Sequence, residues 1–131
     1  MTFAADLRAY CEKTQVDVER FTRRVALQIE ASCVGLSPVD TGRFRANWFI
    51  GIGSPYRQTS LMVDKDGSTT ILKAAGALEA WQPGQEIWVS NSLPYAQRLE
   101  YGWSKQAPGG MVRLTVQRFG DFISKAAGDL G

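Results

Sequence analysis

The first quarter of the chain carries an apolar stripe longer than a domain of this size can cover. Apolar or small residues recur there at steps of three and four, which is the spacing of an amphipathic helix. The stripe consists of Phe3, Leu7, Cys11, Thr14, Val18, Phe21, Val25, Ile29 and Cys33. It predicts a helix over residues 3–34 that ends at Gly35, Ser37 and Pro38. Because such a helix is about 48 Å long, part of it is expected to pack on another subunit.

The rest of the chain alternates short strand and helix patterns, which is typical of one α+β domain. A length of 131 residues predicts a single domain over residues 1–131. Strands are predicted at 48–52 and 86–90. Between them, residues 54–68 form the longest irregular stretch, which is either a flexible loop or a segment ordered only by a partner.

Two further segments have helical spacing. Thr69 or Thr70 is expected to cap a helix that runs through Trp81. Residues 111–117 alternate like a strand, but a longer helical spacing continues through Ala126 and favours a helix. The expected fold class is therefore α+β, with a long N-terminal helix packed on a small, mostly antiparallel sheet with two or three further short helices.

The composition excludes several kinds of catalytic and metal site. The chain has no histidine and two cysteines. Cys11 and Cys33 lie about 33 Å apart along the predicted helix, too far for an intrachain disulfide. A zinc site, a Cys–His nucleophile and a Ser-His-Asp triad all need groups that this chain lacks. Much of enzymatic chemistry is therefore excluded, and we predict no catalytic, cofactor-binding or metal-binding residues and no cofactor.

Charge and hydropathy bear on the partners and the location. A net charge of +2 is too small to indicate nucleic acid or an anionic membrane as the main partner. Residues 1–9 lack the pattern of a secretory signal, and no stretch approaches the roughly 20 apolar residues of a spanning helix. We expect a protein that is made and folded in the cytoplasm, with no membrane partner.

Asp40 begins the triplet Asp-Thr-Gly found in aspartic proteases, where two aspartates share a proton and activate water. A homodimer could supply the second copy, so a homodimeric hydrolase using Asp40 remains an alternative. Arg43 argues against it, because an arginine nearby would hold the carboxylate ionised. The favoured interpretation is a turn in which Asp40 or Thr41 caps a short helix. Glu100 could pair with Asp40 for hydrolysis, but nothing in the sequence sets their distance.

Three arginines, Arg20, Arg23 and Arg24, lie on one face of the predicted long helix. A solvated face is the simplest interpretation, with Glu19 and Arg23 forming an ordinary i,i+4 pair. The alternative is contact with an acidic neighbouring subunit or with a DNA backbone, which makes a DNA-contacting adaptor a further possible function.

Residues 91–102 predict a rigid corner in which a strand enters a turn and a short amphipathic helix follows. Glu100 lies beside Tyr95, Arg98, Tyr101 and Trp103 in the sequence, and these residue types are enriched in interface hot spots. Core packing accounts for Leu99 and is an alternative for Tyr101, whereas Arg98 and Glu100 are predicted as contact residues. The corner residues that we predict as interface or structural are Tyr95, Arg98, Glu100, Tyr101 and Gly102.

Three segments, residues 37–48, 91–102 and 107–113, together resemble the neck and tail-completion proteins of long-tailed bacteriophages. In that family a block with Asp-Thr-Gly-Arg, a hydrophobic residue and Arg precedes a block with Pro-Tyr-Ala and then Glu-Tyr-Gly. The similarity spans nearly the whole chain, although residues 54–70 match neither block.

The resemblance implies a non-enzymatic α+β virion protein that forms a homo-oligomeric ring at the head–tail junction, as a neck, tail-completion or minor tail component. The implied partners are copies of itself in a ring, expected to be a hexamer, and the adjacent head-connector and tail or tail-terminator proteins. Non-specific contact with DNA in the channel is also implied. The implied location is the virion, after assembly in the host cytoplasm. The copy number and the side of the joint stay open. By motif match, the structural corners would be Asp40, Thr41, Gly42, Arg43, Tyr95, Ala96, Glu100, Tyr101 and Gly102.

Overall fold

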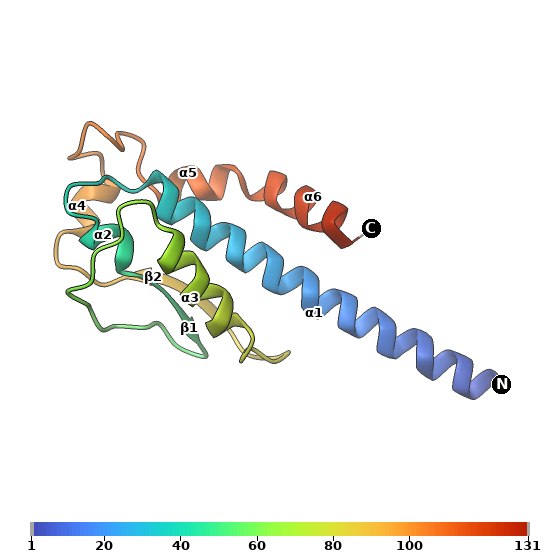
Figure 1. Ribbon diagram of the computed structural model, residues 1–131. Coiled ribbons are helices and arrows are strands. Elements are labelled where there is room, and N and C mark those ends of the chain that lie inside the picture. The colour runs from blue at the N-terminus through green and yellow to red at the C-terminus, as the bar shows by residue number, and fades with distance from the viewer. Residues whose placement is uncertain (1, 131) are drawn as a thin grey trace.

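A computed structural model describes residues 2–130 and has an α+β architecture (Figure 1). Within that range the elements are α1 (Phe3–Leu36), α2 (Arg43–Ala46), β1 (Trp48–Ile52), α3 (Ser68–Leu78), β2 (Ile87–Asn91), α4 (Ala96–Glu100), α5 (Val112–Gln117) and α6 (Phe119–Leu130). The predicted class is confirmed: a long N-terminal helix accompanies a two-stranded antiparallel sheet. Five shorter helices follow α1 in the described range instead of two or three.

α1 confirms the predicted long helix and extends two residues beyond the predicted end. The Thr2 hydroxyl caps its start by accepting a hydrogen bond from the Ala5 amide at 3.2 Å. At its end, the Ser37 hydroxyl donates to the Cys33 carbonyl at 2.6 Å and accepts from the Trp48 indole at 2.7 Å. Figure 1 shows the N-terminal part of α1 projecting past all the other elements.

The sheet lies against α1 and α3, and buried side chains form two groups beside it. β1 and β2 pair with Trp48 opposite Asn91 and Ile52 opposite Ile87. One cluster, near the end of α1, consists of Cys33, Val34, Phe44, Trp48, Leu93, Ala107 and Met111. The other, between α1, α3 and the sheet, consists of Ala26, Ile50, Ala74 and Leu78. The first cluster joins both blocks of the sequence to the end of α1.

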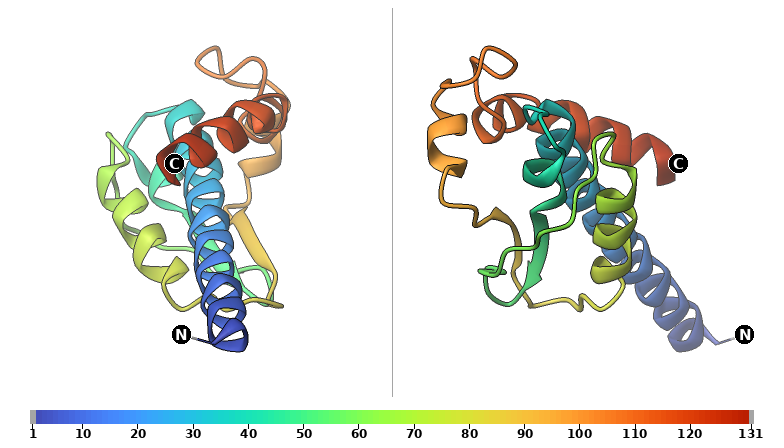
Figure 2. Two further views of the ribbon diagram at one scale, coloured as in Figure 1. Left: turned by 90° about the vertical axis from the view of Figure 1, so that its right-hand side faces the viewer. Right: turned by 60° about the vertical axis from the view of Figure 1, so that its left-hand side comes forward.

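The C-terminal segment is helical, which resolves the ambiguity at residues 111–117. It consists of two helices, because the Arg118 amide donates to the carbonyls of both Leu114 and Thr115 and tightens the last turn of α5. α6 then runs antiparallel beside α1 (Figures 1 and 2), with Ala126 fully buried.

The start of α3 differs from the expected cap at Thr69 or Thr70. Gly67 precedes the helix with φ of 82° and has no side chain to cap it. The Asp64 carboxylate takes that role, because it accepts hydrogen bonds from the Gly67 amide at 3.2 Å and the Thr70 amide at 2.8 Å. Asp64 comes from the preceding loop, so the cap lies further upstream than the helix periodicity indicates.

Residues 54–68 contain no helix or strand before Ser68, but the subunit itself holds this loop. The fully buried Asn47 accepts from the Ser60 amide at 2.7 Å and donates to the Ser60 carbonyl at 3.0 Å. The Asp64 amide donates to the Gly42 carbonyl at 3.0 Å. The Tyr56 ring packs on Phe49, with ring centroids 4.4 Å apart. These contacts join the loop to α2, β1 and the turn before α2 within the subunit.

Replacing Asn47 with alanine is expected to lower the free energy of unfolding by about 2–4 kcal/mol, because the part-buried Ser60 amide and Arg43 carbonyl lose their partner. Urea denaturation measures this loss, and hydrogen exchange at the Ser60 amide should quicken. Gln58→Ala, in an exposed side chain of the same loop, is the control. Equal stability of the two variants would contradict the assignment of Asn47 as the loop's anchor.

Candidate functional site

The structure brings the two sequence blocks together around one open cavity. The cavity has a volume of about 290 Å³ and lies between the end of α1, α2 and α4. Its lining residues are Pro38, Val39, Asp40, Thr41, Gly42, Arg43, Phe44, Tyr95, Leu99, Ser104 and Gln106. The Asp-Thr-Gly-Arg block and the Pro-Tyr-Ala block therefore form two walls of one corner.

Contacts between these walls hold the corner together. The rings of Phe44 and Tyr95 lie 6.0 Å apart between centroids. The Asn91 amide group donates to the Phe44 carbonyl at 2.9 Å. Gln106 bonds both backbone groups of Val39, accepting at 2.8 Å and donating at 3.1 Å. Gln106 lies outside the quoted blocks, and no periodicity or motif in the sequence indicates this contact.

The Asp-Thr-Gly-Arg block forms a tight turn against the loop. Of the two expected caps, Thr41 is the one that acts, because its hydroxyl accepts from the Arg43 amide at 3.2 Å. Gly42 has φ of 92°, and a Cβ there would lie 2.7 Å from the Lys65 amide nitrogen, so only glycine fits. The Arg43 guanidinium donates to the Ser60 carbonyl at 3.1 Å. Asp40 is exposed at the rim.

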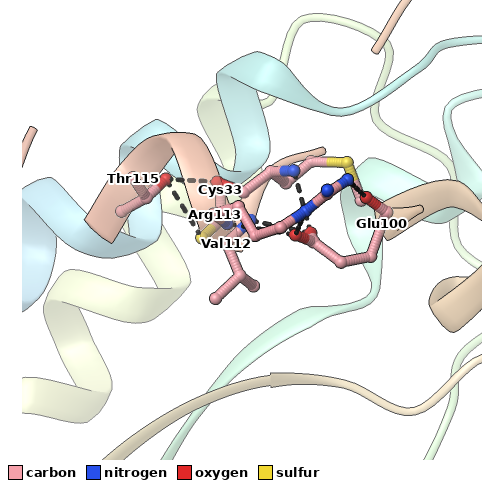
Figure 3. Close-up of polar contacts among 6 residues, drawn as sticks. Cys33, Glu100, Val112, Arg113 and Thr115 are labelled. Atoms are coloured by element: carbon pink, nitrogen blue, oxygen red, sulfur yellow. Dashed lines mark hydrogen bonds and ion pairs between the residues drawn. The ribbon is translucent and has the colours of Figure 1, made fainter. Parts of the chain in front are cut away.

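Glu100 is bound to the start of α5 within the subunit, as Figure 3 shows. Its carboxylate accepts from the amides of Met111 at 2.9 Å, Val112 at 2.8 Å and Arg113 at 3.0 Å. The Arg113 side chain forms an ion pair with the same carboxylate at 3.2 Å and also donates to the Glu100 carbonyl. These bonds satisfy amides that would otherwise lack partners at the beginning of a helix.

The electrostatics of Glu100 follow from that geometry. Burial raises the pKa of its carboxyl, but the backbone hydrogen bonds from Val112, Arg113 and Met111 outweigh burial and hold the pKa below its ordinary value. The carboxylate is thus stabilised in its ionised form, and it does not line the cavity that contains Asp40. The arrangement makes Glu100 a structural residue of the corner and not a partner for Asp40 in hydrolysis.

Beside this corner, aromatic and arginine side chains pair on the surface. The Arg98 guanidinium lies 5.1 Å from the Trp103 ring centroid, and Arg113 lies 5.3 Å from that of Tyr101. Trp103 and Tyr101 are 72% and 63% exposed. Tyr101 is thus a surface residue and not part of the core, whereas Leu99 packs against the first cluster, as predicted.

Gly102 ends the corner with φ of 86°, in the left-handed region that favours glycine. A Cβ at this position would lie 2.8 Å from the Pro108 carbonyl oxygen. The glycine therefore allows the third segment of the resemblance, which contains Pro108, to approach the backbone of the second.

Arg23 is one of the three arginines of the predicted face, and carbonyls of the subunit itself bind its side chain. Arg23 donates to the carbonyls of Leu78 at 3.1 Å and Trp81 at 2.8 Å, and it lies over the Trp81 ring. It therefore stabilises the C-terminal end of α3, where carbonyls lack helical partners. Glu19 lies 3.9 Å from Arg23, the predicted i,i+4 pair. Arg20 and Arg24 are exposed.

Among the side chains that the structure describes, no group of three or more histidine, cysteine, aspartate or glutamate residues lies in a position to hold a metal ion. In the part of the chain that the structure describes, no helix is both long and apolar enough to cross a membrane. Comparisons with protein-family models, with curated proteins and with solved structures find no match to this chain.

Replacing Asp40 with asparagine is expected to leave the midpoint of thermal unfolding within about 2 °C of the parent, because Thr41 forms the cap and Asp40 is exposed. Differential scanning calorimetry measures this. A peptidase assay on both proteins is the companion measurement. Peptide cleavage by the parent that disappears in Asp40→Asn would contradict the structural interpretation and favour the hydrolase.

Proposed function

We propose that this chain is a structural virion protein of a tailed phage that forms a homo-oligomeric ring at the head–tail junction, as a neck or tail-completion component. The observation that carries the proposal is the corner itself, where the two sequence blocks of the resemblance meet around one cavity. The two blocks are separated by residues 49–90 in the sequence, and their meeting supports a joint structural role.

The tasks of the block residues support this function. Thr41 caps a turn, Gly42 and Gly102 allow close backbone approach, and Glu100 binds the start of a helix. Each of these tasks shapes the subunit, and none activates a nucleophile or water. Such a set suits a protein that acts by shape and contact.

Surface features beside the corner support assembly with other proteins. Arg98 with Trp103 and Arg113 with Tyr101 form exposed pairs of the residue types that dominate interface hot spots. We assign this surface to contacts with neighbouring subunits or with an adjacent ring.

The loop supplies a second contact surface. Its tip consists of Leu61, Met62 and Val63, which are 84%, 49% and 58% exposed. Three consecutive exposed apolar side chains are typical of a docking site, and the anchors at Ser60 and Asp64 hold both ends of this tip. We assign the tip to contact with an adjacent ring or with the channel.

A phage that carries a defective copy of this gene provides the test, with the chain supplied in trans. Without the chain, infected cells should accumulate separate heads and tails. A variant with Leu61, Met62 and Val63 all changed to serine should fold normally and still fail to join them, whereas Leu72→Ser, at an equally exposed position on α3, should restore joining. Normal infectious yield without the chain would contradict the function, and normal yield with the serine variant would contradict the role of the tip.

A further inference from the structure

An apolar groove runs along α1 between α6 and β2. Its volume is about 300 Å³. Figure 2, left, views the molecule from the N-terminal end of α1, with α6 above this helix and β2 at its side. The groove is lined by Phe21, Thr22, Val25, Ala26, Ile29, Ile87, Val89, Phe119 and Ile123, and we call it the α1–α6 groove. Eight of these nine residues are apolar, so its occupant must present an apolar surface.

The α1 wall of this groove continues the apolar stripe of the projecting helix. Phe21, Val25 and Ile29 line the groove, and the same steps of three and four lead back along the sequence to Val18 and then to Phe3. We call residues 3–18 the overhang. Figure 1 shows the N-terminal part of α1 projecting past the other elements, and Val18 is 52% exposed.

We propose that the overhang of one copy docks its apolar stripe in the α1–α6 groove of the next copy. The overhang and the groove are different surfaces, so the contact is head-to-tail, and repeated contacts of this kind close into a ring when the rotation allows it. The proposal names the contact between copies and rests on the proposed function for the closure of that ring.

A second copy of this chain is the favoured occupant, because the length of its overhang and the apolar composition of its stripe match the groove. The stripe from Phe3 to Val18 extends about 22 Å along the helix, and the groove wall from Phe21 to Ile29 extends about 12 Å. The overhang can therefore fill the groove along its whole length. Each copy offers one overhang and one groove, so a ring leaves neither surface uncovered.

Mixing two variants tests the docking. Leu7→Glu with Val18→Glu places charges in the stripe of the overhang and leaves the groove intact. Phe119→Glu, at a residue 46% exposed, places a charge in the groove and leaves the overhang intact. The matched controls are Ala9→Glu, at an exposed position on the opposite side of α1, and Val116→Glu, 67% exposed on α5. Phe119→Gln replaces Phe119→Glu if the latter has lost its helical circular dichroism.

Sedimentation velocity gives the readout. We expect the parent and both controls to self-associate, and each test variant alone to be monomeric. An equimolar mixture of the two variants should recover a heterodimer, because one intact overhang meets one intact groove. Monomers in the mixture, or a parent that stays monomeric at its highest soluble concentration, would overturn the proposal. Groove variants that associate normally would overturn it too and indicate pairing of two overhangs.

The outcomes also separate this inference from the proposed function. Copies that dock in this way but never enter phage particles would contradict the junction role alone. If the chain forms rings in particles, and the overhang and groove variants still join heads to tails normally, the docking alone would be contradicted.

Discussion

Replacing Glu30 with glutamine is expected to stabilise the protein at pH 8 and above and to change its stability little near pH 4.5. Glu30 is fully buried, and neither of its carboxylate oxygens has a hydrogen-bond partner among the described residues. Desolvation raises the pKa of its carboxyl from 4.5 to about 8. Folding therefore favours the neutral acid.

The sign of the pH dependence follows from the raised pKa. The stability that protonated Glu30 contributes is fully present below pH 4.5 and is lost as pH rises toward about 8. The loss is on the order of 3–5 kcal/mol, a large share of the 5–15 kcal/mol typical of a small domain. Glutamine has a similar shape and no charge to bury, so the variant should lack this loss.

Urea denaturation from pH 4.5 to 9 measures the effect as the difference between Glu30→Gln and the parent. Glu12→Gln, at an exposed position of the same helix, should give a curve parallel to the parent's. Parallel curves for Glu30→Gln and the parent over that range would contradict the assignment of Glu30 as a buried neutral acid.

Replacing Glu100 with alanine is expected to lower the free energy of unfolding by about 2–4 kcal/mol at neutral pH. The amides of Met111, Val112 and Arg113 lose their acceptor, and the Arg113 side chain loses its ion-pair partner. Because α5 begins at these amides, the corner should loosen where residues 91–102 meet residues 107–113. Urea denaturation and hydrogen exchange at the three amides measure the loss.

Acid should reproduce this loss in the parent. The pKa of Glu100 is lowered on folding, so the stability from its carboxylate is present above the ordinary value of 4.5 and is lost as pH falls through the folded value. Glu79→Ala, at an exposed glutamate beyond α3, is the matched control. A Glu100→Ala variant as stable as Glu79→Ala would contradict the role of Glu100 at the start of α5.

Elements with strong local patterns were predicted well from the sequence. α1 was predicted over 3–34 and spans Phe3–Leu36, and β1 matches the predicted residues 48–52. Both have long or clear apolar periodicity, together with nearby residues that end the element. β2 and α3 were predicted with small differences at their ends, where hydrogen bonds from distant residues decide the boundary.

Contacts between distant residues were not predictable in the same way. Asn47 reaches a loop residue thirteen positions away, and Gln106 reaches Val39, which is 67 positions away in the sequence. The burial of Glu30 was indicated by its helical spacing to Ala26 and Val34, but the longer apolar stripe of the helix obscured that spacing. Ala26 and Val34, four residues to either side of it, are both buried, so the three residues share one face of α1.

The candidate site was predictable as two blocks, but not as one cavity. The sequence indicates a turn at Asp40 and a corner at residues 91–102, and only the fold brings them together. Similarly, the contact role expected of Glu100 was inferred from its aromatic and arginine neighbours, whereas its bonds to α5 depend on chain geometry eleven or more residues away.

Cryo-electron microscopy of intact phage particles, with this chain located by a fused tag, tests the central proposal most directly. We expect a closed ring of copies at the joint between head and tail, with the overhang of each copy on its neighbour. Particles that join heads to tails and contain no copy of this chain at the joint would contradict the account.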